Sequence, residues 1–200
     1  MRCLNKVIKM IVIGVSGKKG SGKDTFFHML EKNSKIPVYR LALADTLKNE
    51  IYERILKPDG LERQLLDNVE TKENFRTLLQ WWGTEYRRRM FQDEYWLVKL
   101  AEQIKQYDGQ NVIVVVTDVR FQNEFKFLKE MNGLMVRIAR PNTDACADEH
   151  PSETALDNET NFDTFVDNNG SLEQFEQLVQ TYIYSLESRT PCTKLVSVVR

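Results

Sequence analysis

The 200 residues carry a net charge of −1 at pH 7 and predict one soluble domain, long enough to bury a hydrophobic core without disulfides. The balanced charge supplies no basic field for nucleic acid or an anionic membrane, and no apolar run reaches the roughly 18 residues that a membrane helix needs. The polar first residues do not resemble a secretory signal, and the scattered cysteines, Cys3, Cys146 and Cys192, lack metal-type spacing. We therefore expect reduced thiols in a cytoplasmic protein.

Strand and helix patterns alternate along the chain. Runs of β-branched and apolar residues predict strands at 7–15, 37–42, 111–117, 133–139 and 163–167. Helical patterns lie at 24–33, 44–56, 121–131 and 172–186, and residues 61–108 are expected to be mostly helical, with breaks at Gly83 and Asp93. Ser171 and Gln174 have the spacing of a capping box for the last helix. The alternation predicts an α/β fold with a parallel five-stranded sheet flanked by helices, and ligands at the carboxyl ends of its strands.

A glycine-rich segment joins the first predicted strand to the first predicted helix. It reads Gly17-Lys18-Lys19-Gly20-Ser21-Gly22-Lys23, which matches the phosphate-loop pattern G-x-x-x-x-G-K in the context that the pattern requires. Glycines let successive backbone N–H groups point inward, and the helix N-terminus adds positive potential for phosphate oxygens. We expect Lys23 to reach the β- and γ-phosphates of a nucleotide; the alternative is a glycine turn without a ligand.

The residue after the loop lysine departs from the usual pattern. Asp24 stands where a Ser or Thr commonly contacts Mg²⁺, and Thr25 follows it. Either Thr25 takes that role, or Asp24 holds Mg²⁺ directly or through a water. A carboxylate beside a triphosphate is repelled unless a cation intervenes, so Asp24 favours a metal-assisted site.

A second polar pair follows the most apolar strand. Asp118 and Arg120 come directly after residues 112–116, at the carboxyl end of that strand. If this strand neighbours the first, Asp118 lies near the phosphate loop, where it could hold Mg²⁺ through a water while Arg120 binds phosphate bidentately. The alternative is an ion pair that only caps the sheet.

The helical middle of the chain carries several candidates. Arg76 and Gln80 are four residues apart and share a helix face, so they could present a cation and an amide to a monophosphate and its base; the alternative is a solvated polar face. We interpret Trp81 and Trp82 as core residues rather than base-stacking platforms. The run of arginines at 87–89 is interpreted as a solvated face.

Residues 141–162 are polar, acidic and poorly periodic, which predicts a mobile flap. Arg137 and Arg140 stand at its start. Arg140 leaves a strand at the ligand edge of the sheet, so it could clamp phosphate or stack on adenine. For His150, a local hydrogen-bonding role is expected at least as much as a catalytic one.

These features form an ordered set with further blocks at 43–48, 76–84, 93–99, 118–120, 140–141, 150–153 and 168–172. Over about residues 10–186 the set resembles the bacteriophage deoxynucleoside monophosphate kinases, which are P-loop nucleoside monophosphate (NMP) kinases. In that family an aspartate is expected at position 24. The resemblance implies a kinase core at about 7–43, 109–139 and 163–188, a helical NMP-binding insertion at about 44–108 and a lid at about 140–162.

The resemblance also implies an activity: ATP with Mg²⁺ phosphorylates a deoxynucleoside monophosphate to the diphosphate, in deoxynucleotide biosynthesis. The implied partners are small molecules and not nucleic acid or membrane, a homodimer stays open, and a virus-encoded enzyme would act in the host cytoplasm.

The expected catalytic residues are Lys23, Asp118, Arg120 and Arg140. Nucleotide binding is expected at Gly17, Lys18, Lys19, Gly20, Ser21, Gly22, Lys23, Asp24, Thr25, Arg140, Asn169 and Gly170. Acceptor binding is expected at Asp45, Lys48, Arg76, Gln80, Gly83, Trp96 and Arg120, and metal binding at Asp24, Thr25 and Asp118.

Other functions remain open at this point. Phosphomevalonate kinase, another small-molecule P-loop kinase, has a similar Gly-Lys-Asp loop. A nucleotide-binding switch ATPase or GTPase is an alternative, although the chain lacks a guanine-reading Asn-Lys-x-Asp motif. A binding module with a relic loop is another, although the intact Lys23 and the loop glycines argue against decay. The segment before Arg76 looks shorter than in the family, so base preference is not predicted.

Overall fold

A computed structural model of the chain describes residues 10–141 and 150–188. The contacts divide the chain into two compact units, one of Met1–Leu41 with Gln106–Arg200 and one of Ala42–Lys105. The expected boundaries of the insertion and the lid stay predictions. The interpretation of the three cysteines and the start of the first predicted strand lie outside the described residues. Within the described ranges, no helix has the length and apolar character that crossing a membrane requires.

The first unit is built on a five-stranded, all-parallel sheet in the order β2-β3-β1-β4-β5. Its strands are β1 (Ile11–Ser16), β2 (Val38–Leu41), β3 (Ile113–Val116), β4 (Leu134–Ala139) and β5 (Thr164–Asp167). The predicted parallel sheet flanked by helices is thereby confirmed. The central strand β1 pairs with β3 and β4, with Gly14 opposite Val116 on one side and Met135 on the other. The segment that follows β1 therefore starts from the middle of the sheet.

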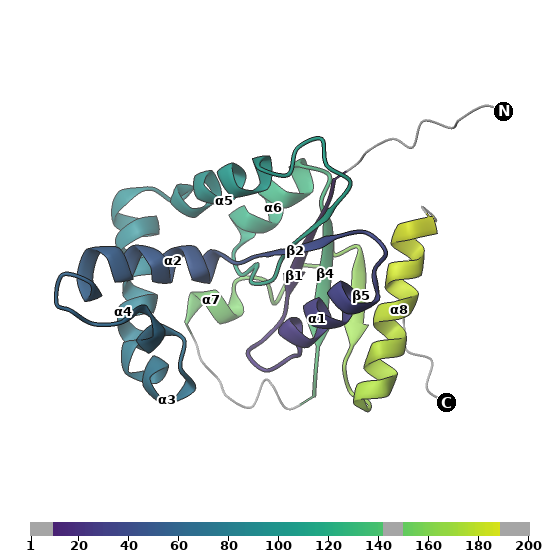
Figure 1. Cartoon of the computed structure of the whole chain (residues 1–200), viewed down its shortest axis with the longest axis horizontal. Coiled ribbons are helices and arrows are strands. Elements are labelled where there is room, and N and C mark those ends of the chain that lie inside the picture. Colours follow the sequence, from purple (N-terminus) through teal and green to yellow (C-terminus); the bar gives the residue numbers. More distant parts are fainter. Residues whose placement is uncertain (1–9, 142–149, 189–200) are drawn as a thin grey trace. The chain divides into compact units, whose positions relative to one another are not determined.

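Helices cover both faces of this sheet (Figure 1). They are α1 (Lys23–Asn33), α6 (Gln122–Glu130) and α8 (Leu172–Ser188), and the short helix α7 (Pro151–Thr154) also belongs to this unit. Because side chains alternate along a strand, Ile13 and Val15 point to one face, where they join a core with Phe26 of α1 and Phe175 of α8. On the other face, a Cβ added to Gly14 would collide with Leu128 of α6, so that helix packs directly on β1.

The predicted capping box at the start of α8 is confirmed. The backbone N–H of Ser171 donates to the side-chain oxygen of Gln174 (2.8 Å), and the backbone N–H of Gln174 donates to the Ser171 hydroxyl (3.3 Å). The reciprocal bonds satisfy two backbone N–H groups that the first helical turn leaves without partners.

The second unit is helical, as expected. Its elements are α2 (Leu43–Ile51), η1 (Tyr52–Leu56), η2 (Arg63–Leu66), α3 (Val69–Lys72), η3 (Glu73–Phe75), α4 (Arg76–Gln80), η4 (Trp81–Phe91) and α5 (Tyr95–Lys105). Ile51, Leu56 and Leu66 are the fully buried centre of its core. The expected break at Asp93 lies between η4 and α5, but the expected break at Gly83 is wrong. Gly83 lies inside η4, a π-helical stretch that continues the chain from α4 without a turn.

The prediction of a solvated arginine run is wrong for two of its three members. Arg87 and Arg88 are buried, with 6% and 7% of their surfaces exposed. The guanidinium of Arg87 pairs with Glu50 on α2 and lies 4.5 Å from the ring centroid of Tyr95. Burial would raise the pKa of Glu50, but hydrogen bonds from Tyr95, Arg87 and Trp82 outweigh it and hold that pKa below its usual value. A charged group can be buried when a partner compensates it, and this partner is remote in the sequence.

The interpretation of Trp81 as a core residue is also wrong, because 44% of its surface is exposed. Trp82 is part-buried and packs against the core of the second unit, with its indole N–H donating to Glu50 (3.1 Å). Consecutive helical residues point about 100° apart, so two neighbouring tryptophans rarely share one environment.

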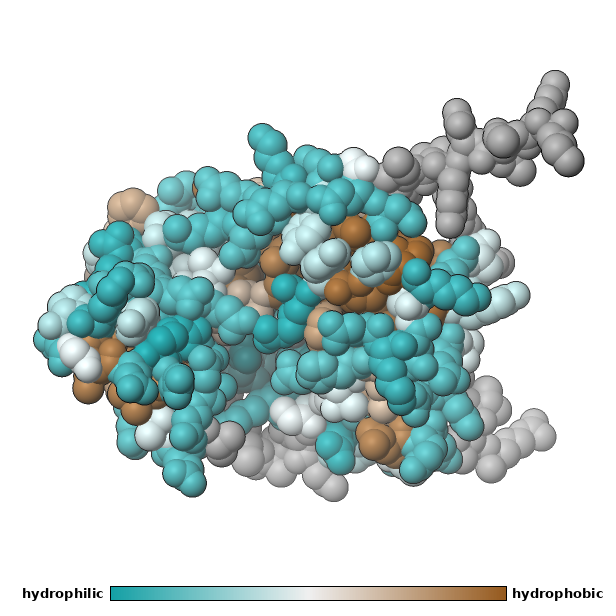
Figure 2. Space-filling model, in the orientation of Figure 1, coloured by the Kyte–Doolittle hydropathy of each residue, from teal (hydrophilic) through white to brown (hydrophobic). Residues whose placement is uncertain are grey.

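On the face shown in Figure 2, hydrophilic residues cover most of the surface and hydrophobic residues gather in separate patches.

Candidate phosphate-binding site

The glycine-rich loop leaves the carboxyl end of β1 and leads into α1. A Cβ added to Gly17 would lie 2.5 Å from the carbonyl oxygen of Ile138 on β4, so only glycine allows the backbone to pass there. Gly22 caps α1 with a φ of 102°, a left-handed conformation that side chains disfavour. No side chain caps the N-terminus of α1, which leaves its first N–H groups and its positive dipole end directed into the loop. The predicted loop therefore has the backbone that phosphate binding needs.

The side chain of Lys23 folds back over this loop. Its ammonium group donates to the carbonyl oxygens of Gly17 (2.7 Å) and Lys18 (2.8 Å). Burial, and to a smaller extent the nearby Arg120, lower the pKa of Lys23 from 10.5 to about 8. Three carboxylates oppose this shift, those of Glu153, Asp24 and Asp118. An arginine and three carboxylates are thus close enough to interact electrostatically with Lys23.

Asp118 and Arg120 lie at the same edge of the sheet as the loop, as expected from neighbouring strands. β3 pairs with β1, and the backbone N–H of Val119 donates to the carbonyl oxygen of Val15 (3.1 Å). The backbone of Arg120 is held in turn by Glu124, whose buried carboxylate accepts the Arg120 N–H (2.7 Å) in the first turn of α6. The guanidinium of Arg120 is thus presented from a fixed backbone and remains about one-third exposed.

The segment 150–159, which contains α7 and is called the α7 segment below, contacts the loop through charged groups. The ammonium group of Lys18 donates to the carbonyl oxygen of Glu153 (2.7 Å) and to the carboxylate of Asp157 (2.5 Å). Arg137 on β4 also donates to Asp157 (3.1 Å). His150 has the structural role that was one of its two expectations, because its ring nitrogen accepts the backbone N–H of Ser152 (3.2 Å) and caps α7.

The remaining candidates of the first unit lie after β4 and β5. Arg140 follows β4, and its guanidinium lies 3.5 Å from the carbonyl oxygen of Gly20. Asn169 and Gly170 are exposed, and the Asn169 amide donates to Asp167 (2.9 Å). Their role in nucleotide binding stays a prediction. The adjacent Asn168 contacts the loop directly, and its side-chain amide donates to the carbonyl oxygen of Ser21 (2.9 Å).

We predict that Asn168→Ala loosens the phosphate loop. The change removes the hydrogen bond to Ser21 and the amide that lies against Gly22. The expected cost is about 1 kcal/mol in the free energy of unfolding, because the buried carbonyl loses its partner. Chemical denaturation measures it, with Asn169→Ala as the matched control at an exposed position. An equal loss in both variants would contradict an anchoring role for Asn168.

The acceptor-binding candidates all lie in the second unit, except Arg120. The ammonium group of Lys48 is mostly buried and lies 2.7 Å from Asp67 and 4.0 Å from Asp45. Arg76 donates to Glu73 (2.8 Å) and shares α4 with Gln80, which is part-buried. These placements leave the prediction for Asp45, Lys48, Arg76 and Gln80 untested.

Gly83 and Trp96 differ from the other acceptor-binding candidates. Both are buried, and the indole N–H of Trp96 donates to the carbonyl oxygen of Gly83 (2.9 Å). Their contact joins η4 to α5, which favours a structural role over contact with a substrate.

Three residues that bear on the site were missing from the expected set. Glu124 positions Arg120, Asn168 anchors the loop, and the Glu153 carboxylate contacts both Arg120 and the Lys19 N–H. Glu153 and Asn168 belong to blocks that the family resemblance had marked, so the sequence carried a signal for them. Nothing in the local sequence separates Glu124 from other helical glutamates.

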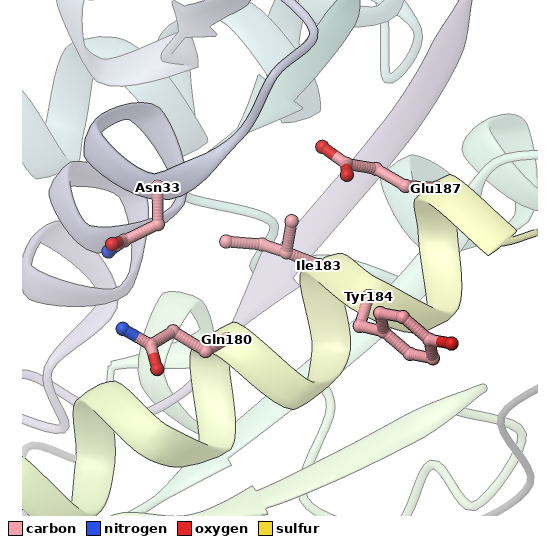
Figure 3. A pocket seen from close by; sticks show the side chains of 5 residues that line it. All are labelled: Asn33, Gln180, Ile183, Tyr184 and Glu187. Atoms are coloured by element: carbon pink, nitrogen blue, oxygen red, sulfur yellow. The ribbon is translucent and has the colours of Figure 1, made fainter.

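A pocket elsewhere in this unit has a different character. It lies where the last residue of α1 faces α8 and is lined by Asn33, Gln180, Ile183, Tyr184 and Glu187 (Figure 3). In this view Ile183 points toward α1, whereas Tyr184 points away. The lining contains no cation, and its one charged group is a carboxylate, so it does not suit phosphate.

Comparison with known proteins points in one direction. A family model described as deoxynucleotide monophosphate kinase matches residues 56–179. A protein of Acanthamoeba polyphaga mimivirus, provisionally named a deoxynucleotide monophosphate kinase, is 32% identical over 184 residues, which cover 83% of this chain and 92% of that protein. The deoxynucleotide monophosphate kinase of Escherichia phage RB69 is 25% identical over 146 residues, 72% of this chain and 59% of the phage protein. The deoxynucleoside-5′-monophosphate kinase of Escherichia phage T5 is 33% identical over 87 residues, 40% of this chain and 34% of that protein.

Proposed function

The chain belongs to the deoxynucleotide monophosphate kinase family, and on that premise we propose that it transfers the γ-phosphoryl group of ATP to a deoxynucleoside 5′-monophosphate, releasing ADP and the diphosphate. The family resemblance expected from the sequence is confirmed, and the protein is a kinase that acts on nucleotides. The observation that carries the proposal is the phosphate loop, whose Lys23 ammonium lies within the fields of Asp118 and Arg120 at one edge of the sheet.

The proposed reaction does not require a general base from the protein. The phosphate of the acceptor has a second pKa of about 6, so its attacking oxygen is already ionised at neutral pH. The barrier lies in bringing two anions together and in stabilising charge on the transferred group, which positioned cations and backbone N–H groups provide. His150 is engaged in capping α7, and this reaction does not need it as a base.

The residues of the first unit divide these tasks. The loop N–H groups and Lys23 hold the β- and γ-phosphates, and the ammonium group exchanges its two carbonyl partners for phosphate oxygens. Arg120 grips the acceptor phosphate with its planar, bidentate guanidinium. Arg140, which stands beside Gly20 of the loop, neutralises charge and helps to exclude water, a competing acceptor.

The donor set fits Mg²⁺. Asp24 and Asp118 place two carboxylates within electrostatic reach of Lys23, and the Thr25 hydroxyl follows Asp24 in the first turn of α1. Magnesium binds through one or two carboxylates together with substrate phosphates and waters, and Asp24 and Asp118 supply two carboxylates. When bound, the ion neutralises phosphate charge. Asp24, Thr25 and Asp118 are the residues proposed to hold it.

The second unit is proposed to recognise the acceptor nucleoside. Arg76 and Gln80 lie four residues apart on α4, and Asp45 and Lys48 lie on α2. A guanidinium and an amide on one helix face offer both charge and base-edge hydrogen bonding to a nucleotide.

A panel of acceptors tests the proposed function. With ATP and Mg²⁺, we expect ADP release that depends on a deoxynucleoside monophosphate, with dAMP, dGMP, dTMP and dCMP compared in one coupled assay. The ribose forms and phosphomevalonate are expected to react more slowly. Transfer to phosphomevalonate alone would replace the proposed acceptor, and ATP hydrolysis without any acceptor dependence would indicate a switch protein.

A further inference from the structure

The α7 segment places a carboxylate on groups that phosphate would use. One oxygen of Glu153 accepts the backbone N–H of Lys19 in the phosphate loop (3.3 Å), and the other pairs with the guanidinium of Arg120. Its side chain is only 12% exposed. Loop N–H groups and guanidinium groups are two kinds of donor that bind phosphate oxygens. The two oxygens of the Glu153 carboxylate occupy one donor of each kind.

The position of Glu153 is held independently of this carboxylate. Its own backbone carbonyl accepts a hydrogen bond from Lys18 (2.7 Å), and Asp157, further along the segment, pairs with Lys18 and Arg137. The amide of Gln122 donates to the carbonyl oxygen of Ala155 (3.3 Å). The segment is thus fixed at several points, and the Glu153 side chain can change partners without loss of the whole segment.

We propose that Glu153 acts as a built-in competitor for phosphate, occupying Arg120 and the Lys19 N–H until the polyphosphate of a nucleotide displaces it. This inference rests on the proposed function, because it concerns the same phosphate loop. A triphosphate makes the exchange favourable, since it engages the Lys19 N–H that Glu153 gives up together with the other loop N–H groups and Lys23. Displacement also releases Arg120, so that the arginine becomes available to the acceptor only when the nucleotide is bound.

The exchange has a measurable cost in affinity. A ligand that binds only the form with open donors has its apparent affinity reduced by the fraction of molecules in that form. Removing the charge of Glu153 while keeping its shape weakens the pair with Arg120 and raises that fraction. We expect about a tenfold gain in affinity, which corresponds to about 1.4 kcal/mol.

The test uses Glu153→Gln in the full chain and inorganic triphosphate as the probe, titrated calorimetrically at pH 7 and constant ionic strength. The expected result is a dissociation constant about tenfold lower than that of the unchanged protein. Glu159→Gln is the matched control, because it removes the same charge from the same segment. Glu159 accepts the N–H groups of Thr160 and Asn161 in its own turn and a side-chain hydrogen bond from Gln122, and these partners belong neither to the phosphate loop nor to Arg120. Glu159→Gln is expected to leave the dissociation constant within about twofold.

Two further measurements keep the proposal open to refutation. In an Arg120→Ala background, Glu153→Gln should give little gain, because the pair that it weakens is already absent. Glu153→Asp, one methylene shorter, should give an intermediate gain if Glu153→Gln proves unstable. Unchanged or weaker binding of triphosphate by Glu153→Gln would overturn the inference. Because the probe has no base and no transfer is measured, that result would leave the kinase assignment intact. Failure of the acceptor panel would remove the role of the released Arg120 toward an acceptor, and the titration would still decide whether Glu153 competes with triphosphate.

Discussion

Replacement of Lys23 by alanine is expected to lower kcat/KM for ATP by about 10³-fold, the scale seen when one preorganised charge-stabilising donor is removed. The ammonium group already lies inside the loop, bonded to the carbonyl oxygens of Gly17 and Lys18. Lys23 is the first residue of α1, so its ammonium group reaches the loop from the N-terminus of that helix. Steady-state kinetics with a saturating acceptor measure the loss.

Lys32→Ala is the matched control on the same helix, since Lys32 lies in the last turn of α1 and is mostly exposed. Both variants are expected to stay folded, with free energies of unfolding within about 2 kcal/mol of the unchanged protein. Near-normal turnover by Lys23→Ala would contradict the role of the lysine.

The same side chain predicts a pH dependence. Burial and Arg120 lower the pKa of Lys23 to about 8, so the charge that binds phosphate is lost as the pH rises above that value. The dissociation constant for nucleotide should be constant below about pH 7.5 and rise by at most about tenfold per pH unit above pH 8, and Lys23→Ala should lack this rise. The effect on folding has the opposite sign. Between pH 8 and 10.5 the unfolded chain holds the extra proton, so this lysine adds stability as the pH increases.

Asp118→Asn is expected to lower turnover by about 10- to 100-fold and to raise the Mg²⁺ concentration needed for half-maximal rate. Asn keeps the size of the side chain at the carboxyl end of β3 but removes its charge. The loss of charge also removes one of the fields that raise the pKa of Lys23, so the comparison belongs at pH 7, where the lysine remains charged. Initial rates as a function of Mg²⁺ at fixed ATP give both quantities.

Asp108→Asn serves as the control for Asp118, because it makes the same change in an exposed turn before β3. It should leave both the rate and the Mg²⁺ dependence as they are. If Asp118→Asn kept its rate and its Mg²⁺ dependence to within about twofold, Asp118 would be a residue that only caps the sheet.

Much of the first unit could be predicted because its signals are local. Strands such as β3, with Ile113 and its valines, are apolar on both faces and need no partner to be recognised. The capping box of Ser171 and Gln174 spans three residues, and the phosphate loop is contiguous. The position of Asp118 beside the loop needed one further assumption, that β3 neighbours β1, and the strand order confirms it.

The misjudged Arg87 and the missed Glu153 and Asn168 have a common cause in partners that are distant along the chain. Arg87 belongs to a run that looks solvated, yet Glu50 and Tyr95 enclose it from other helices of the second unit. Glu153 lies more than 130 residues after the loop that it contacts, and Asn168 lies farther still. Periodicity and composition report the average environment of a segment, not the identity of one remote partner.

By itself, the sequence determined the α/β class, the phosphate loop with Lys23, and the family, because each depends on the order of neighbouring residues. Only the tertiary structure decided which carboxylate lies on Arg120 and the Lys19 N–H, what holds the loop at Ser21, and which groups compensate the buried charge of Arg87. The physical reason is that the energy of a buried or paired charge depends on the groups within a few ångströms of it, and folding brings those groups together from distant parts of the chain.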